Sequence, residues 1–175
     1  AVPVVAFDGG AQGANADFLI TDGALAARTI LMVHRTIGNP PDGPTPIIGD
    51  TASYISLRRS GTSWNVPGDG NDFINPVGST FRVDGVTSTS SPLGIAQQIA
   101  TERGTAAFNF TRVQLARHNS GGATLPGRSY FGEIGEVLMI NRALNNTERA
   151  IIENSFSAKY NLPLNTGGGA LDLYA

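Results

Sequence analysis

Apolar positions along this chain fall mostly in short runs that are separated by glycine, proline, asparagine and aspartate. β-Branched and aromatic residues are frequent in these runs, which is typical of strands bounded by turns. The pattern therefore predicts an all-β fold, built as a sandwich or a barrel. The predicted strands cover residues 3–8, 17–20, 28–37, 53–59, 79–83, 86–90, 106–117 and 129–141.

Alternation is clearest in residues 106–117, where Phe108, Phe110, Val113 and Leu115 are the expected core positions. The phase of the alternation changes between Phe110 and Val113, so we expect a β-bulge within one continuous strand. Residues 38–46 and 61–71 are too rich in glycine and proline to be predicted as strands.

A two-residue turn is predicted at Asp84-Gly85, between the apolar pairs of two short strands. Aspartate and glycine both tolerate positive φ, which a type I′ turn requires at its two central positions. The sequence therefore predicts a β-hairpin centred on these two residues.

One helix is predicted near residues 146–160. Asn145 is a suitable N-cap, and Glu148 stands where its side chain can reach back to the N–H of the cap residue. Asn161, followed by Leu162 and Pro163, is a suitable left-handed stop.

The faces of this helix follow from its spacing. Ile152, Phe156 and Tyr160 recur every fourth residue, with Ile151 beside them, and should form the packed stripe. The polar positions are expected to face water, and these are Glu148, Arg149, Glu153 and Lys159.

Composition narrows the classes of function. The chain has 175 residues, a length that suits one domain. Its net charge is −2 and only 15% of its residues are charged, so no basic surface is expected to attract nucleic acid. There is no cysteine, and no apolar run is long enough to insert into a membrane.

Several segments resemble a known superfamily. The run GEIGEVLMINRALNNTERAIIENSFSAKYNL at 132–162 is similar to the closing strand and terminal helix of the concanavalin A-like lectins and glucanases, in their bacterial laminin G-like branch. Phe7-Asp8-Gly9 resembles an early strand of that family, residues 29–35 its long core strand, and residues 82–86 its central hairpin. The resemblance implies a two-sheet antiparallel jelly roll over residues 1–163, followed by a tail at 164–175.

The tail has two readings. Residues 165–169 (NTGGG) have the composition of a flexible linker, and residues 170–175 (ALDLYA) alternate like a strand. The tail is either a frayed chain end or a strand. Members of the resembling family usually begin with a strand that this chain starts too late to hold, and the tail could take that place. It would do so in its own sheet or on the exposed edge of a neighbouring copy.

Catalysis is not predicted. Glycan hydrolases of the resembling superfamily place two carboxylates at alternate positions of one strand, where both reach the scissile bond. Glu133 and Glu136 are three residues apart and should point to opposite faces, while Gly135 and Val137 occupy the positions where a partner of Glu133 is required. His34 and His118, the only histidines, are expected to be hydrogen-bonded structural residues.

No cofactor is required by any motif, although calcium is one possibility. Asp69, Asn71 and Asp72 offer hard oxygen ligands in a glycine-containing segment. The alternative, which we favour, is an ordinary polar turn.

The candidate ligand face is centred on Trp64, the only tryptophan, which stands in a polar segment. An exposed indole ring there would stack on a sugar, while Asn65 and Asn71 bind hydroxyls and Tyr54 and Arg58 line the same surface. The alternative is that Trp64 folds back into the core.

These observations favour a non-catalytic recognition or adhesion module. It would bind a glycan or a surface protein and belong to a larger extracellular, cell-surface or virion-surface assembly. The alternative is a structural protein, such as a virion decoration, capsid-associated, fibre or filament subunit, that self-associates through its C-terminal tail.

Overall fold

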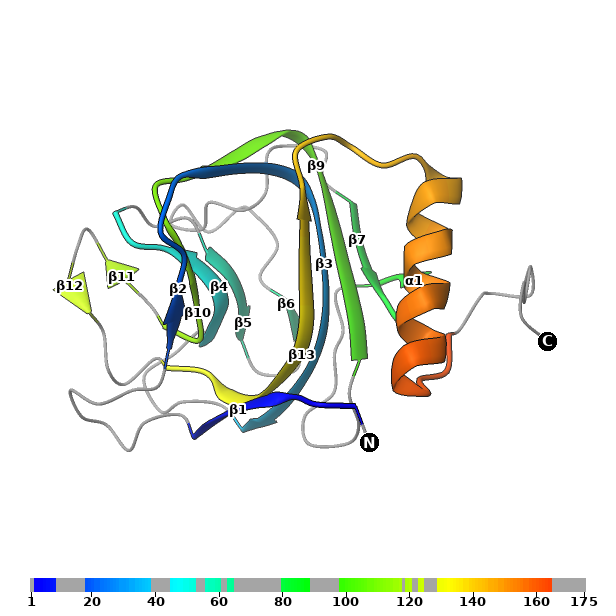
Figure 1. Cartoon of the computed structure of the whole chain (residues 1–175), viewed down its shortest axis with the longest axis horizontal. Coiled ribbons are helices and arrows are strands. Elements are labelled where there is room, and N and C mark those ends of the chain that lie inside the picture. The colour runs from blue at the N-terminus through cyan, green and yellow to red at the C-terminus, as the bar shows by residue number, and fades with distance from the viewer. Residues whose placement is uncertain are drawn as a thin grey trace.

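The computed structural model describes residues 2–8, 18–38, 45–52, 56–60, 63–64, 80–88, 98–117, 119–120, 123–124 and 129–164. These residues are mostly β, with antiparallel sheets and one helix, an arrangement compatible with a β-sandwich. Figure 1 shows two sheets facing each other, with the helix on the outer side of the larger sheet.

The larger sheet has six strands and the smaller has five, and all the described strand pairs are antiparallel. In sheet order the larger one contains β1 (Val5–Asp8), β13 (Phe131–Ile140), β3 (Leu25–Gly38), β9 (Gln98–Phe110), β7 (Thr80–Val83) and β8 (Val86–Thr87). The smaller one contains β2 (Leu19–Ile20), β10 (Val113–Leu115), β4 (Thr45–Asp50), β5 (Ser56–Ser60) and β6 (Ser63–Trp64). A separate two-stranded pair is formed by β11 (Asn119–Ser120) and β12 (Ala123–Thr124), and the helix is α1 (Asn146–Tyr160).

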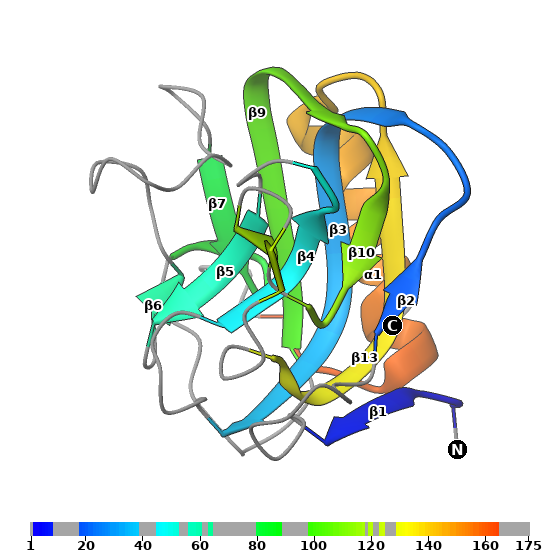
Figure 2. The same cartoon turned by 90° about the vertical axis from the view of Figure 1, so that its left-hand side faces the viewer.

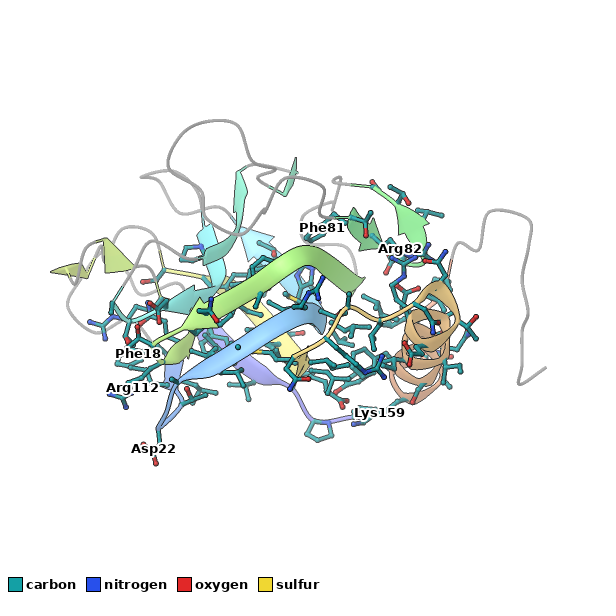
Figure 3. The ribbon with its side chains drawn as sticks, turned by 90° about the horizontal axis from the view of Figure 1, so that it is seen from above. Phe18, Asp22, Phe81, Arg82, Arg112 and Lys159 are labelled. Atoms are coloured by element: carbon teal, nitrogen blue, oxygen red, sulfur yellow. The ribbon has the colours of Figure 1, made fainter. Side chains whose placement is uncertain are left out.

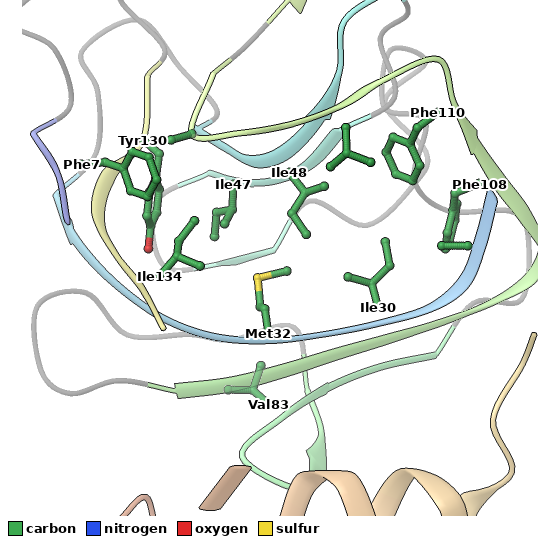
Figure 4. Packing of buried hydrophobic residues seen from close by; sticks show 13 residues of the cluster. Phe7, Ile30, Met32, Ile47, Ile48, Val83, Phe108, Phe110, Tyr130 and Ile134 are labelled. Carbon is green, nitrogen blue, oxygen red and sulfur yellow. The ribbon is translucent and has the colours of Figure 1, made fainter. Parts of the chain in front are cut away.

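The main core lies between the two sheets (Figure 4). Ile30 and Met32 of β3 face Ile47 and Ile48 of β4, and none of these four side chains has measurable exposure. At one end the rings of Phe7 and Tyr130 pack at a centroid distance of 6.2 Å. Removal of this apolar surface from water is the main force that holds the two sheets together.

A second apolar cluster lies between the larger sheet and α1. Leu31 and Val33 of β3 pack there with Ile99, Leu144 and Phe156. Because successive side chains of a strand point to opposite faces, Ile30 and Met32 belong to the core between the sheets, while Leu31 and Val33 belong to the cluster beside α1. This strand is therefore buried on both faces.

The ends of α1 confirm the predicted capping. The side chain of Asn145 accepts from the backbone N–H of Glu148 at 2.9 Å, and the Glu148 carboxylate accepts from the N–H of Asn145 at 2.9 Å. At the other end Asn161 has φ 53° and ψ 50°, the left-handed conformation expected there. Local sequence alone was sufficient to place this helix.

The prediction for the faces of the helix was wrong at three positions. Ile151, expected in the packed stripe, is 51% exposed. Arg149 and Glu153, expected to face water, are 6% and 2% exposed. Burial of the Glu153 carboxylate is possible because the Arg82 guanidinium of β7 meets it through Nε at 3.2 Å and Nη2 at 3.1 Å.

The predicted hairpin is confirmed. Asp84 and Gly85 have φ values of 48° and 83°, both positive as a type I′ turn requires. The Asp84 carboxylate also accepts from the backbone N–H of Ile99 at 2.8 Å, which fixes the hairpin to β9.

Residues 106–117 do not form the single bulged strand that alternation predicted. The chain leaves the larger sheet after Phe110 and enters the smaller one at Val113. The buried carboxylate of Asp50 accepts from the backbone N–H groups of Thr111 and Arg112, at 2.7 and 3.0 Å, and so satisfies the turn between the sheets. Asp50 thus has a structural role at this turn.

The expectation that residues 38–46 and 61–71 hold no strand was also wrong in part. Gly38 ends β3, Pro46 lies in β4, and Ser63 and Trp64 form β6. Proline is tolerated in β4 because the register shifts between Pro46 and Ile48, and such irregularities release the need for a ladder N–H.

Candidate functional site

The predicted glycan face falls largely outside the described residues. Tyr54, Asn65 and Asn71 belong to the part that is not described. The backbones of Arg58 and Trp64 lie on the adjacent strands β5 and β6, where Arg59 is the register partner of Trp64. The structure thus brings the backbones of two predicted residues close together, while the glycan face itself stays a prediction.

Asp69 and Asp72, the candidate calcium ligands, also lie outside the described residues. Among the residues that are described, no three histidine, cysteine, aspartate or glutamate side chains gather into a group able to hold a metal ion.

The prediction that Glu133 and Glu136 point to opposite faces was wrong. Glu133 is the register partner of Arg35 and Glu136 that of Val33, with a register shift between Ile134 and Glu136. Since Arg35 and Val33 are two residues apart on β3, both carboxylates lie on the same face of β13, the one that carries α1.

Each of these carboxylates pairs with a basic side chain. Glu133 meets Nη2 of Arg35 at 2.5 Å, and Glu136 meets Nζ of Lys159 at 2.6 Å. The hydrogen bond that Lys159 donates to Glu136 raises the pKa of Lys159. Partial burial raises the pKa of the neighbouring Tyr160. Glu136 thus joins β13 to the last turn of α1, which is a structural role.

His34 is fully buried, as expected for a structural histidine. Its Nδ1 lies 3.5 Å from the hydroxyl of Tyr130, which also receives a hydrogen bond from Thr36 at 3.3 Å. These three side chains form a closed polar group inside the core, with no access for a substrate. His118 lies outside the described residues.

An apolar pocket of about 260 Å³ opens where the edges of the two sheets meet, between β2, β10 and β13. It is lined by Leu19, Ile20, Thr21, Val113, Leu115, Val137 and Met139. None of these described lining residues has a side chain that ionises, so they offer apolar surface and no acid or base.

The one polar residue in the wall, Thr21, is already engaged. Its N–H donates to the carbonyl of Val113 at 2.9 Å, and its hydroxyl accepts from the N–H of Val113 at 3.0 Å and donates to the carbonyl of Gly23 at 3.2 Å. The Thr21 carbonyl accepts from Nε of Arg112 at 2.9 Å. The wall is therefore apolar in effect as well as in composition.

Exposed apolar side chains surround this pocket. Phe18, Leu19 and Ile20 are 40%, 49% and 37% exposed, although large aliphatic and aromatic residues are usually buried. The guanidinium of Arg117 lies 4.2 Å from the centroid of the Phe18 ring. Figure 3 shows Phe18 and Arg112 at the end of the molecule opposite Lys159 and the helix.

The strand pairing of β13 is also incomplete at this edge among the described residues. β1 pairs with β13 only from Phe131 to Ile134. On that outer side, no described strand pairs with residues 136–140 of β13, although their inner side pairs with β3. The pocket, β2 and the free side of residues 136–140 are together called the open edge below.

Sequence reasoning missed the open edge because its parts come from three distant segments. Leu115 and Val113 were expected in the core, and residues 17–20 as a strand, but nothing in the alternation shows that these positions meet Val137. The sequence alone carries no signal that these segments meet.

Comparison with known proteins finds no family model, no curated protein and no solved structure that matches this chain. In the described part of the chain, no helix has the length and apolar character needed to cross a membrane.

Proposed function

We propose that this chain is a non-catalytic recognition module of the concanavalin A-like, laminin G-like kind, with its two sheets arranged as a jelly roll. It serves a larger surface assembly by binding a glycan or a surface protein. The observation that carries this proposal is the open edge, where exposed apolar side chains lie beside a pocket whose described lining residues are not ionisable.

At the open edge the chemistry favours a protein over a glycan. The pocket is smaller than the roughly 300–1,000 Å³ of typical small-molecule sites, and its size suits one or two apolar side chains. Free backbone groups beside it add hydrogen bonds that an extended protein segment can use. A glycan would find few hydroxyl partners among the lining residues.

A displayed library of extended peptides tests the open edge. We expect saturable binding that Leu19→Asp abolishes, since it places a charge at the pocket mouth. Ile151→Asp is the matched control, because Ile151 on α1 is 51% exposed and Leu19 is 49% exposed. Equal losses in both variants, or binding that Leu19→Asp leaves intact, would count against the open edge as a binding site.

A glycan array tests the predicted face at Trp64. Saturable binding lost in Trp64→Ala and retained in Leu19→Asp would identify a glycan module that uses Trp64. No binding in either experiment would reject the recognition proposal.

A second candidate is a structural subunit of a virion, fibre or filament. The unpaired side of residues 136–140 favours it, because a free strand edge is a template for pairing with another chain. Association in solution without any added ligand, combined with no binding of peptide or glycan, would support this candidate.

A further inference from the structure

The open edge combines two features that a β-strand would satisfy together. In the described part of the chain, no strand pairs with the outer side of residues 136–140 of β13. Val137 and Met139 of the same segment line the apolar pocket, while Leu138 and Ile140 pack on the helix side. An added strand would therefore need apolar side chains at alternate positions, and only on the side that faces the pocket.

The chain itself contains such a segment. Beyond Leu164, the last described residue, residues 165–169 read NTGGG and residues 170–175 read ALDLYA. In an antiparallel pairing with Ala170 opposite Ile140, Leu171 falls opposite Met139 and Leu173 opposite Val137. Both leucines then meet the β13 residues that line the pocket, and Asp172 lies on the other side.

Handedness opposes a parallel pairing of the tail with its own β13. Figure 2 views the larger sheet from the side opposite α1, with β13 pointing upward and its outer edge on the right. Seen from the helix side, a strand added at this edge lies to the left of β13. A parallel strand there would complete a left-handed β–α–β crossover, whereas about 98% of such connections are right-handed.

An antiparallel pairing within one chain strains the linker. The last turn of α1 lies beside Glu136, where Lys159 contacts it at 2.6 Å. Ala170 would have to reach the level of Ile140, about 13 Å further along the strand, and also pass around the sheet edge. The chain from Leu164 to Ala170 spans about 20 Å only when fully extended. A tail that comes from another molecule has no such restriction.

We propose that the open edge of one copy binds residues 170–175 of a second copy as an antiparallel strand, with Leu171 and Leu173 in the pocket. The inference rests on the open edge being a binding site and names its partner. The neighbouring chain completes the larger sheet, and its leucines cover the exposed apolar lining.

Sizing by light scattering tests the association. We expect the full chain to form a dimer or a larger assembly at micromolar concentration, and a chain that ends at Leu164 to be monomeric. Leu171→Asp with Leu173→Asp should match the shortened chain, while Ala170→Ser with Asp172→Asn, on the opposite side of the strand, should associate normally. A monomeric full chain would overturn the proposal.

Cysteine pairing tests the register, since the natural chain has no cysteine. One chain carrying Leu138→Cys is mixed with another carrying Asp172→Cys, and we expect a mixed disulfide between them. Directly opposite residues in antiparallel strands have Cα atoms about 4.5–5.5 Å apart, within disulfide range. Leu171→Cys replaces Asp172→Cys as the control and should link at least tenfold more slowly, because its side chain faces the pocket.

The failures of the two proposals are distinguishable. If one chain carrying both Leu138→Cys and Asp172→Cys links only to itself, the tail is bound within one molecule and the second copy is rejected. If no link forms and the full chain is monomeric, while peptide binding stays sensitive to Leu19→Asp, the open edge is a recognition site for another partner. If the chain associates through its tail but binds no peptide or glycan, the recognition module is rejected instead.

Discussion

The apolar cluster between the larger sheet and α1 and the apolar open edge differ in how far their side chains are covered. On the helix side, Phe156 is 4% exposed, and the pair of Arg82 with Glu153 closes the margin of the cluster. At the open edge, Leu19 is 49% exposed, and the described residues that line the pocket include no ionisable side chain. One surface is thus sealed by buried charge and the other is left apolar and uncovered. Apolar side chains are therefore buried in one place and left exposed in the other.

The seal on the helix side can be broken at Glu153. Glu153→Ala removes the carboxylate that contacts Arg82 at 3.1 Å and Arg149 at 3.9 Å. Loss of one partner of a buried ion pair costs about 3–5 kcal/mol, and we expect the lower end because Arg82 keeps 21% side-chain exposure. Urea unfolding measures the change, with the exposed Ser155→Ala as control. A loss below about 1 kcal/mol would show that burial of this pair does not seal the cluster.

Substitution of glycine by alanine should act differently beside the main core and near the open edge. A Cβ on Gly132 would meet the carbonyl oxygen of Arg35 inside contact distance and lie 2.7 Å from the Tyr130 hydroxyl. Gly132→Ala should therefore lower the free energy of unfolding by about 2–3 kcal/mol. Gly23, close to the open edge, has nothing within 4 Å of such a Cβ, so Gly23→Ala should stay within about 0.5 kcal/mol. Similar losses from both variants would contradict the contrast in packing.

The smallest effect concerns pH and the start of α1. The Glu148 carboxylate accepts hydrogen bonds from Arg142 at 2.8 Å and from the backbone N–H of Asn145. Both hydrogen bonds hold the pKa of Glu148 below its ordinary value of 4.5. A lowered pKa means stability that is present above 4.5 and lost as pH falls through the folded value. Wild type should exceed Glu148→Gln slightly in stability at pH 7, and the difference should shrink as the pH falls below 4.5. Thermal unfolding of both proteins measures it, and a difference that persists in acid would assign the effect to packing.

Features fixed by neighbouring residues were predictable from the sequence. The capping pair Asn145 and Glu148 and the turn at Asp84-Gly85 depend on groups within three residues of each other, and all of them form as expected. All the groups that form the cap and the turn are present in the local sequence, so these features do not depend on tertiary contacts.

Features fixed by distant residues were not predictable. Glu153 reads as a solvent-facing position until Arg82, which is 71 residues away, is brought beside it. Asp50 likewise ends the strand at Phe110 by binding the N–H of Thr111, 61 residues further along. The open edge has the same origin, because its pocket forms only where three separate segments meet.

The position of β3 has a consequence for how this protein melts. Ile30 and Met32 belong to the layer between the sheets, and Leu31 and Val33 to the layer beneath the helix, so a single ribbon of backbone is shared by both. Neither layer can lose its order while the other keeps this strand in place. The domain should consequently denature in one cooperative step, with the signals from the helix and from the sheets vanishing at the same temperature.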